Sequence, residues 1–325
     1  MTPLKWGLIG AGDIVRKRVA AALRDSSAST LVAIARARSD LAASFAGEVG
    51  AARSYADWRS LIAAPDIDAV YVATPVHLHA EQTIAAAEAG KHVLCEKPMA
   101  LDVDECDHML AACRAHRVHL GVAYYRHFYP VIQRMKGLLD ADEIGDPVYA
   151  QINAFEWFDL PPDHPRAWFL KREQAGGGPM FDFGCHRLEV LTHLFGSVRR
   201  VSGMLANVLF SRDVEDTAVA FLQFERGTCA TVTVTHAVAE PRDTLEIFGS
   251  RGSLHVGQLN KGELRIRQGG AERVEAHPPA ANLHLPLVED FIDAVVHRRD
   301  PGVPGETGRE IARLEQAIYA TEVRT

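Results

Sequence analysis

The sequence predicts an α/β protein with an N-terminal doubly wound parallel sheet and a C-terminal α/β domain with a large, open, mostly antiparallel sheet. Short apolar runs alternate with alanine-rich helical stretches in the first third of the chain, a pattern typical of βαβ units. A glycine-rich turn follows the first apolar run, as in the Rossmann fold. Beyond residue 124 the period-two strands are longer, which predicts two domains, 1–123 and 124–325.

The parallel sheet is predicted from five apolar runs with helical stretches between them. The second run follows the first closely enough for a right-handed crossover. Gly90 is expected to end a helix, because glycine readily takes the left-handed conformation at a helix C-terminus. The predicted strands are 4–9, 31–35, 68–72, 91–95 and 118–121, and the predicted helices are 14–24, 80–89 and 102–116.

In the second domain, alternating apolar and polar residues predict strands that turn residues separate. Residues 225–227 are expected to join two of these strands in an antiparallel hairpin. The predicted strands are 148–154, 218–224, 228–234, 244–248 and 264–266, framed by helices 130–139, 180–194, 287–297 and 307–320.

The composition is that of a globular protein and argues against several classes of partner. The 325 residues include 35 Lys and Arg against 42 Asp and Glu, a formal net charge of −7, without an obvious basic cluster. We therefore expect no nucleic acid and no membrane as partner. The five cysteines lack zinc-type spacing, and we expect no signal peptide, no membrane span and a cytoplasmic location.

The turn between the first strand and the first helix is the first candidate binding site. Because Gly10 and Gly12 lack Cβ atoms, backbone N–H groups there can approach a pyrophosphate at the N-terminus of the helix. Val15 occupies the third small position of the Gly-x-Gly-x-x-Gly pattern. The turn favours a bound dinucleotide, and the alternative is a tight turn without a ligand.

The end of the second strand indicates which dinucleotide is bound. A cofactor without a 2′-phosphate usually meets an Asp or Glu there, which accepts hydrogen bonds from the ribose hydroxyls. This chain has Arg36 and Arg38 instead, whose guanidinium groups suit a 2′-phosphate. NADP is therefore favoured over NAD, and the alternative is that both arginines are ordinary surface residues.

Lys97 follows the predicted strand 91–95, within the sequence Cys95-Glu96-Lys97-Pro98. Ligands of open parallel sheets bind beyond the carboxyl ends of the strands, so this lysine is expected where substrate lies. Pro98 restricts the backbone of Lys97 and permits a cis peptide bond, either of which aims the side chain. A solvated surface charge is the alternative.

A second set of candidate catalytic residues follows a flexible glycine run at residues 176–178. Spacings of four and three residues put Asp182, His186 and Glu189 on one helical face. A carboxylate beside an imidazole orients the ring and stabilises its protonated form, as a general base for alcohol oxidation needs. The alternatives are a capped helix with a satisfied histidine and a metal site, but we expect no metal because the nucleotide features explain the same residues.

Together these motifs resemble the glucose-fructose oxidoreductase, inositol dehydrogenase and MocA family. The resemblance covers most of the chain, and its most specific part is the Gly-Lys-His-Val-x-x-Glu-Lys-Pro string. It rests on the N-terminal glycine loop, on residues 73–79, on Gly90 through Pro98, and on Asp182-x-x-x-His186 after three glycines.

The resemblance implies a nicotinamide cofactor in the Rossmann domain, followed by a substrate-binding and dimerisation domain. The open sheet is then the expected interface of a homodimer or homotetramer. The family's cofactor contacts fall on Gly10, Gly12, Ile14, Thr74, Pro75 and His79, with Glu96 and Lys97 beside the nicotinamide. The family's catalytic lysine, aspartate and histidine fall on Lys97, Asp182 and His186, and Glu189 stands where many relatives have Asp.

The predicted activity is NADP-dependent hydride transfer to or from a secondary alcohol or carbonyl of a sugar, cyclitol or related polyol, with NAD as the alternative cofactor. Histidine, with an ordinary pKa of about 6.5, suits proton abstraction at neutral pH better than lysine, at about 10.4. His186 is therefore the expected proton acceptor and Lys97 the donor to the substrate oxygen, although burial can reverse these roles. The remaining alternatives are an NAD(P)-assisted glycosidase of the same family and a non-catalytic NADP-binding regulator.

Overall fold

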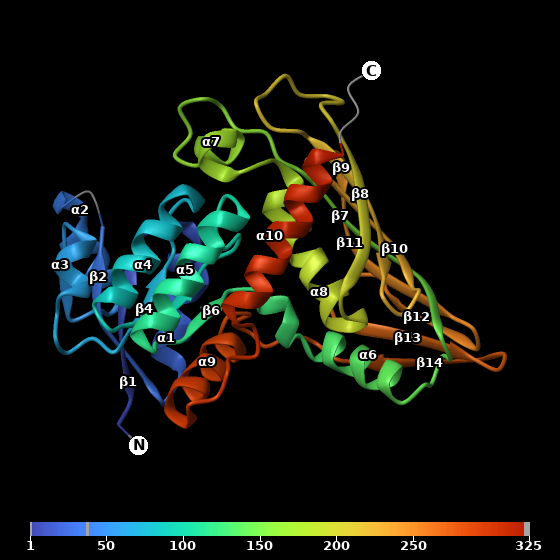
Figure 1. Cartoon of the computed structure of the whole chain (residues 1–325), viewed down its shortest axis with the longest axis horizontal. Coiled ribbons are helices and arrows are strands. Elements are labelled where there is room, and N and C mark those ends of the chain that lie inside the picture. The colour runs from blue at the N-terminus through green and yellow to red at the C-terminus, as the bar shows by residue number, and fades with distance from the viewer. Residues whose placement is uncertain (1, 37–38, 322–325) are drawn as a thin grey trace. The chain divides into compact units, whose positions relative to one another are not determined.

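The structure, a computed structural model, describes residues 2–36 and 39–321, and its chain forms two compact units (Figure 1). Unit 1 consists of Met1–Tyr125 and Ala280–Ala312, and unit 2 of Arg126–Pro279 and Arg313–Thr325. The first crossing between units lies two residues from the predicted boundary at 123/124. The return of residues 280–312 to unit 1 corrects the prediction that one uninterrupted domain spans 124–325.

Unit 1 contains a six-stranded sheet of order β3-β2-β1-β4-β5-β6, in which every pair is parallel. This is the strand order of a doubly wound Rossmann sheet, so the predicted fold class is confirmed for this unit. The strands are β1 (Leu4–Ile9), β2 (Ser29–Ala35), β3 (Arg53–Tyr55), β4 (Ala69–Val72), β5 (His92–Cys95) and β6 (Leu120–Val122).

Two helix ends in unit 1 carry local capping residues. Asp102 caps one helix by accepting a hydrogen bond from the Glu105 backbone N–H at 2.8 Å, and Gly90 has φ +73° after another, as predicted. The helical segments are η1 (Val15–Val19), α1 (Ala20–Asp25), α2 (Ser39–Val49), α3 (Trp58–Ile62), η2 (Val76–Leu78), α4 (His79–Glu88), α5 (Val103–His116), η3 (Tyr125–Phe128), which ends in unit 2, and α9 (Leu285–His297).

Helix α9 belongs to unit 1 because it fills part of that unit's core. The Phe291 ring packs against Trp6 of β1, with ring centroids 5.6 Å apart. A Cβ at Gly121 of β6 would lie 2.8 Å from the same ring, so a glycine there lets Phe291 approach the sheet. The backbone N–H of Val122 also donates to the Val303 carbonyl at 3.0 Å. These contacts explain why residues 280–312 return to unit 1.

Unit 2 contains an eight-stranded sheet of order β14-β13-β12-β11-β7-β10-β9-β8. All neighbouring pairs are antiparallel except β7 with β10, which confirms the predicted mostly antiparallel sheet and the hairpin at residues 225–227. The strands are β7 (Pro147–Trp157), β8 (Val198–Ala206), β9 (Thr217–Phe224), β10 (Cys229–Thr235), β11 (Ala237–Gly249), β12 (Gly252–Val256), β13 (Glu263–Gln268) and β14 (Ala271–Ala276).

One face of this sheet is covered and the other is open. Figure 1 shows α6, α8 and α10 on one side of the sheet, and Ala150, Ile152 and Val232 are buried beneath them. On the opposite face Met204 and Phe221 are 63% and 57% exposed. The helical segments are α6 (Pro130–Asp140), η4 (Ala167–Leu170), α7 (Arg172–Ala175), η5 (Met180–Gly184), α8 (Cys185–Phe195) and α10 (Gly305–Ala320), which begins in unit 1.

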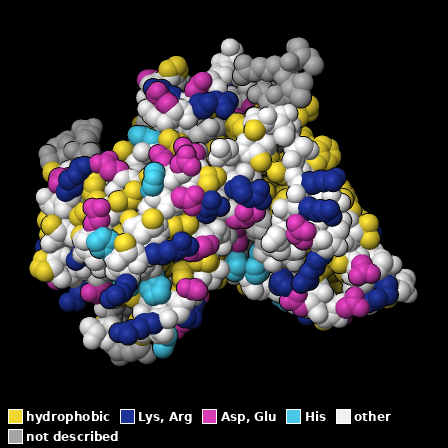
Figure 2. All heavy atoms as spheres, in the orientation of Figure 1, with side chains coloured by type: hydrophobic (Ala, Val, Ile, Leu, Met, Phe, Trp, Pro, Cys, Tyr) yellow, Lys and Arg dark blue, Asp and Glu magenta, His cyan; other side chains and the backbone are white. Residues whose placement is uncertain are grey.

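The surface carries charges of both signs. Figure 2 shows Lys and Arg side chains interspersed with Asp and Glu side chains over the face in view. Within the described part of the chain, no helix has both the length and the apolar character needed to cross a bilayer.

Two pairs of histidines with neighbouring rings predict acid sensitivity. Burial and the neighbouring His119 lower the pKa of His92 to about 4 in unit 1, and burial and His127 lower that of His193 to about 4 in unit 2. Because an unfolded histidine titrates near pH 6.5, the unfolded state binds more protons between pH 6.5 and 4, and stability falls as the pH is lowered through this window.

We expect each pair to cost about 1 kcal/mol of folding stability at pH 5, after allowance for partial exposure. Thermal unfolding at pH 7 and pH 5 measures this. The His92→Gln variant keeps an acceptor for the His119 backbone N–H, which His92 Nδ1 accepts at 3.0 Å. This variant should lose less stability than the parent between the two pH values. An equal loss would contradict the assignment to His92.

Candidate active site

The glycine turn after β1 packs against the loop that follows β4. Gly10 has φ +108°, and a Cβ there would lie 2.4 Å from the Ala73 carbonyl oxygen, so only glycine fits. A Cβ at the exposed Gly12 would instead meet nothing within 4 Å. The chain therefore leaves space beside Gly12, directly before helical N–H groups that lack intrahelical acceptors. This geometry fits a pyrophosphate.

Val15, the departure from the three-glycine pattern, is fully buried. Ile14 already has helical backbone angles, and Val15–Val19 form a π-helical segment that continues into α1. The helix therefore begins at the predicted place after Gly12, and the branched side chain of Val15 is buried in the core.

The end of β2 carries Arg36 and no carboxylate. The Arg36 backbone N–H donates to the Tyr55 carbonyl at 3.0 Å, and its guanidinium lies 5.5 Å from the centre of the Phe45 ring. Arg16 packs against the same ring and pairs with Glu48, whose pKa this pairing lowers. Two guanidinium groups thus flank one aromatic ring at the edge where the ribose of a dinucleotide binds in Rossmann domains. The other predicted arginine, Arg38, lies outside the described residues.

His79 joins the two loops predicted to face the cofactor. Its Nε2 lies 2.9 Å from the carbonyl oxygen of Thr74, after β4, and its Nδ1 lies 2.9 Å from that of Pro98, after β5. Burial lowers the pKa of His79, although the two carbonyl groups oppose this shift, and a neutral ring donates to only one of them. The side chain is 1% exposed. His79 therefore connects the loop after β4 to the loop after β5 from a buried position.

Lys97 is half-buried and follows a carboxylate that is held rigidly within unit 1. Glu96 accepts hydrogen bonds from Tyr71 Oη at 2.8 Å and from the Lys97 backbone N–H at 3.2 Å, and His284 Nε2 lies 3.4 Å away. Burial alone would raise the pKa of Glu96, but His284 and Lys97 lower it below its ordinary value. The Lys97–Pro98 bond is cis. A fixed anion thus precedes the candidate catalytic lysine.

Asp182, His186 and Glu189 lie in unit 2, on η5 and α8. His186 is 3% exposed and Asp182 remains partly open, with 17% of its side chain exposed. The Glu189 carboxylate pairs with His127 Nδ1 at 2.7 Å. Glu189 is thus turned toward His127, and within the described residues Asp182, His186 and Glu189 do not form a group of candidate metal ligands.

Two further polar residues approach Asp182, and the sequence had not singled them out. They are Glu156, near the end of β7, and His236, between β10 and β11; the ligand atoms of all three lie within 4.8 Å of one another. Their proximity depends on the parallel pairing of β7 with β10. No sequence motif encodes that pairing, and an isolated histidine after a strand gives no signal of its own.

The glycine run before η5 is tightly packed, which corrects the expectation that it is flexible. A Cβ at Gly178 would lie 2.1 Å from the Glu215 carbonyl oxygen, and one at Gly177 would lie 2.0 Å from Tyr319 Oη. The buried Glu215 carboxylate accepts hydrogen bonds from the Gly178 N–H at 3.0 Å and from Tyr319 at 2.6 Å. The three glycines therefore fix the start of the helix that carries Asp182 and His186.

Helix α8 is also anchored by a buried ion cluster next to His186. Asp243 lies between Arg187 and Arg126, whose side chains are 4% and 8% exposed. Burial alone would raise the pKa of Asp243, but the two guanidinium groups lower it below its ordinary value. The cluster holds Arg187, and with it the adjacent turn of α8, against β11.

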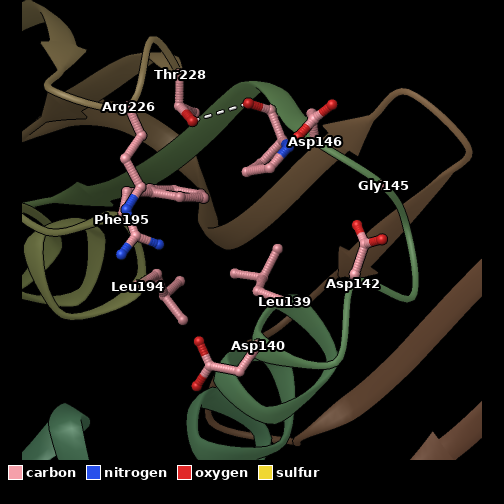
Figure 3. Close-up of a pocket in the computed structure, with 10 residues that line it drawn as sticks. Leu139, Asp140, Asp142, Gly145, Asp146, Leu194, Phe195, Arg226 and Thr228 are labelled. Atoms are coloured by element: carbon pink, nitrogen blue, oxygen red, sulfur yellow. Dashed lines mark hydrogen bonds between the residues drawn. The ribbon is translucent and has the colours of Figure 1, made fainter.

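A small cavity of unit 2, of about 210 Å³, lies apart from these residues (Figure 3). Its walls come from the end of α6, the end of α8 and the turn between β9 and β10. Leu139, Leu194 and Arg226 are among the lining residues, and Thr228 Oγ1 donates across its edge to the Pro147 carbonyl at 2.8 Å. None of the predicted catalytic or cofactor-binding residues lines it, so it is not assigned to the candidate active site.

Comparison with known proteins identifies the family. A family model described as "Oxidoreductase family, NAD-binding Rossmann fold" matches residues 4–124, and one described as "GFO/IDH/MocA C-terminal domain" matches residues 132–255. The chain belongs to the GFO/IDH/MocA oxidoreductase family. The predicted resemblance is thus confirmed, and unit 1 of this GFO/IDH/MocA protein contains an NAD-binding Rossmann domain.

Relatives of this GFO/IDH/MocA protein include enzymes named for sugars. A 1,5-anhydro-D-fructose reductase of Ensifer adhaerens is 31% identical over 335 residues, covering 99% of both proteins. The structure of a levoglucosan dehydrogenase in complex with NADH and levoglucosan has a TM-score of 0.89 at 27% identity, covering 98% of this chain and 97% of that one. An aldose-aldose oxidoreductase from Caulobacter crescentus, complexed with glycerol, has a TM-score of 0.90 at 26% identity, with the same coverage.

Proposed function

We propose that this chain catalyses reversible hydride transfer between NADP(H) and a secondary carbinol or carbonyl of a sugar, cyclitol or related polyol. The observation that carries the proposal is Lys97, half-buried at the carboxyl end of β5 and preceded by the fixed carboxylate of Glu96. Ligands of doubly wound sheets bind at that edge. The names of relatives, a 1,5-anhydro-D-fructose reductase and a levoglucosan dehydrogenase, support a sugar or polyol as substrate.

Each proposed residue has one task in this reaction. Gly10, Gly12 and Ile14 hold the pyrophosphate through their backbone, Thr74, Pro75 and Glu96 line the cofactor's position, and the bound nicotinamide supplies hydride exchange. His186 takes the hydroxyl proton during oxidation and returns it during reduction. Lys97 donates a hydrogen bond to the substrate oxygen as negative charge develops on it, and Asp182 supports the charged imidazole.

Two assays test this proposal. Purified protein freed of nucleotide is titrated with NADPH and with NADH while tryptophan fluorescence is followed, and a panel of sugars and cyclitols is then screened for a net change in reduced nicotinamide. Substrate-dependent net change supports a dehydrogenase or reductase. Release of p-nitrophenol from an aryl glycoside without net cofactor change would instead support the glycosidase alternative.

We propose NADP(H) as the preferred cofactor, because Arg36 follows β2 where NAD-binding chains usually carry an acidic residue. The Arg36→Glu variant should weaken NADPH binding by on the order of tenfold to a hundredfold, since it replaces a charge-assisted hydrogen bond with repulsion. NADH binding should change little. Parallel titrations measure both, and equal losses for the two cofactors, or a parent protein that prefers NADH, would contradict the proposal.

We also propose that the open face of the eight-stranded sheet joins two copies of this chain in a homodimer or homotetramer. Met204 and Phe221 expose apolar side chains there, on neighbouring strands β8 and β9. The double variant Met204→Lys/Phe221→Lys should lower the mass measured by light scattering, because it buries charge in the interface. Its thermal stability at low protein concentration should match that of the parent. A parent protein that is strictly monomeric would contradict the proposal.

We propose a reducing compartment, the cytoplasm, as the site of action. The five cysteines form no disulfide bonds within the described residues, and four of them, Cys95, Cys106, Cys113 and Cys185, are buried. Such thiols fit a compartment that keeps cysteines reduced.

A further inference from the structure

Glu156, Asp182 and His236 form a small polar cluster that the proposed reaction does not use as a whole. In the parallel pairing of β7 with β10, Phe155 lies opposite Thr235, so the next residues, Glu156 and His236, follow side by side on the other face. Asp182 reaches the same point from η5, with its Oδ2 atom 3.6 Å from His236 Nε2. Glu156 is exposed and His236 is buried, so the cluster is accessible from the surface of unit 2 at its Glu156 side.

Arg212 determines which nitrogen of His236 carries the proton. Its Nη2 lies 2.9 Å from His236 Nδ1, and a guanidinium group can only donate, so Nδ1 accepts and the proton is on Nε2. Arg212 is itself fixed by hydrogen bonds to the carbonyls of Phe158 and Glu215, each at 3.0 Å. The rings of Phe158 and Phe183, each with its centroid 4.8 Å from that of His236, hold the imidazole in place.

The Nε2–H group of His236 therefore points toward the carboxylate of Asp182 without bonding to it. It has no hydrogen-bond partner within the described part of the chain, although His236 is only 1% exposed. The 3.6 Å separation from Asp182 exceeds hydrogen-bond distance. A buried donor without a partner destabilises the folded chain, and a bound group that accepts its hydrogen bond removes that cost.

A metal ion does not suit this cluster, although two carboxylates and an imidazole are familiar ligands. A metal needs a free lone pair on the imidazole. In His236 the lone pair of Nδ1 is used by Arg212, and Nε2 carries the proton. A hydroxyl group, by contrast, both accepts and donates, and the cluster offers it one N–H donor and two carboxylate acceptors.

We propose that Glu156, Asp182 and His236 bind one hydroxyl of the polyol substrate other than the hydroxyl that is oxidised, and we call this cluster the hydroxyl subsite. His236 Nε2–H donates to the hydroxyl oxygen, and a carboxylate of Glu156 or Asp182 accepts the hydroxyl proton. Glu156 and His236 thereby become specificity-determining residues. This inference rests on the proposed function, since it assumes a polyol substrate, and it requires that substrate to carry a second free hydroxyl.

Matched variants test the subsite kinetically, with the polyol that the screen identifies. His236→Gln keeps an N–H donor, His236→Phe removes it, and Glu156→Gln removes a charged acceptor. We expect His236→Phe and Glu156→Gln to raise KM by on the order of tenfold or more while kcat changes little, with a smaller effect for His236→Gln. The Kd for reduced cofactor should be unchanged. An unchanged KM, or equal effects of His236→Gln and His236→Phe, would overturn the proposal.

A measurement without turnover separates failure of the subsite from failure of the proposed function. Nitrogen-15 NMR of histidine-labelled protein saturated with NADPH or NADH, assigned by comparison with His236→Gln, should show the Nε2–H form of His236. Arg212→Met should abolish this single form, and levoglucosan or myo-inositol should shift the Nε2 signal of the parent. If a polyol shifts the signal but no sugar is turned over, the subsite stands and the proposed function fails.

The opposite outcomes overturn the subsite alone. If sugars are turned over, but neither the panel nor the identified substrate moves the His236 signal, the proposed function stands and the subsite fails. A shift caused by Mg²⁺ or Zn²⁺, and by none of the polyols, would identify a metal site instead.

Discussion

Replacing His186 by alanine is expected to lower kcat by roughly 10²–10⁴-fold, the usual contribution of a positioned general base. Lys97→Met should cause a loss of the same order, because the developing charge on the substrate oxygen then lacks its donor. His186→Ala should not weaken cofactor binding, since His186 is not among the expected cofactor contacts. Steady-state rates with the identified substrate, together with cofactor titrations, measure both effects.

The pH dependence of the two variants assigns the proton acceptor. If His186 is the base, His186→Ala removes the acidic limb of the kcat/KM profile for oxidation and Lys97→Met retains it. The exposed His116 and Lys261 provide controls, and His116→Asn and Lys261→Met should behave as the parent. Full activity of His186→Ala and Lys97→Met on the true substrate would refute the assigned mechanism.

Gly10→Ala and Gly12→Ala should separate stability from cofactor binding. A methyl group at residue 10 would clash with the Ala73 carbonyl, and φ +108° is unfavourable for alanine, so Tm should fall by roughly 5 °C or more. A methyl group at residue 12 meets no atom of the chain, so Tm should hardly change.

Gly12→Ala should nevertheless weaken cofactor binding by on the order of tenfold or more, because its methyl group fills the space needed for close approach of the pyrophosphate. Thermal unfolding without nucleotide and fluorescence titration with NADPH and NADH measure the two effects separately. Unchanged affinity in Gly12→Ala would show that the open space beside Gly12 is not the phosphate site.

Local sequence signals predicted the elements that carry most of the candidate site. The glycine turn, the strand before Lys97 and the helix of His186 could be placed because apolar periodicity and glycine positions act over a few residues. Short or polar segments such as β3 and α3 gave weak periodicity and were missed. The return of α9 to unit 1 depends on Phe291 packing against Trp6 and Gly121, contacts that no local pattern encodes.

The same distinction applies to individual side chains. Helical spacing predicted that Asp182, His186 and Glu189 share a face, but it could not show that Glu189 pairs with His127 or that His236 lies beside Asp182. Both contacts come from segments remote in sequence. His79 was predicted at the cofactor loops, yet its buried contacts with the carbonyls of Thr74 and Pro98 follow only from the three-dimensional arrangement.

The interleaving of the two units has a consequence for the protein's biosynthesis. The six strands of unit 1 leave the ribosome first, but α9 is made only after residues 126–279, which at roughly 5–20 residues per second takes on the order of ten seconds or more. During that interval the core around Trp6 and Gly121 lacks Phe291. Helix α10 contains the crossing at Ala312/Arg313, so the nascent chain can complete both units only after this helix has emerged.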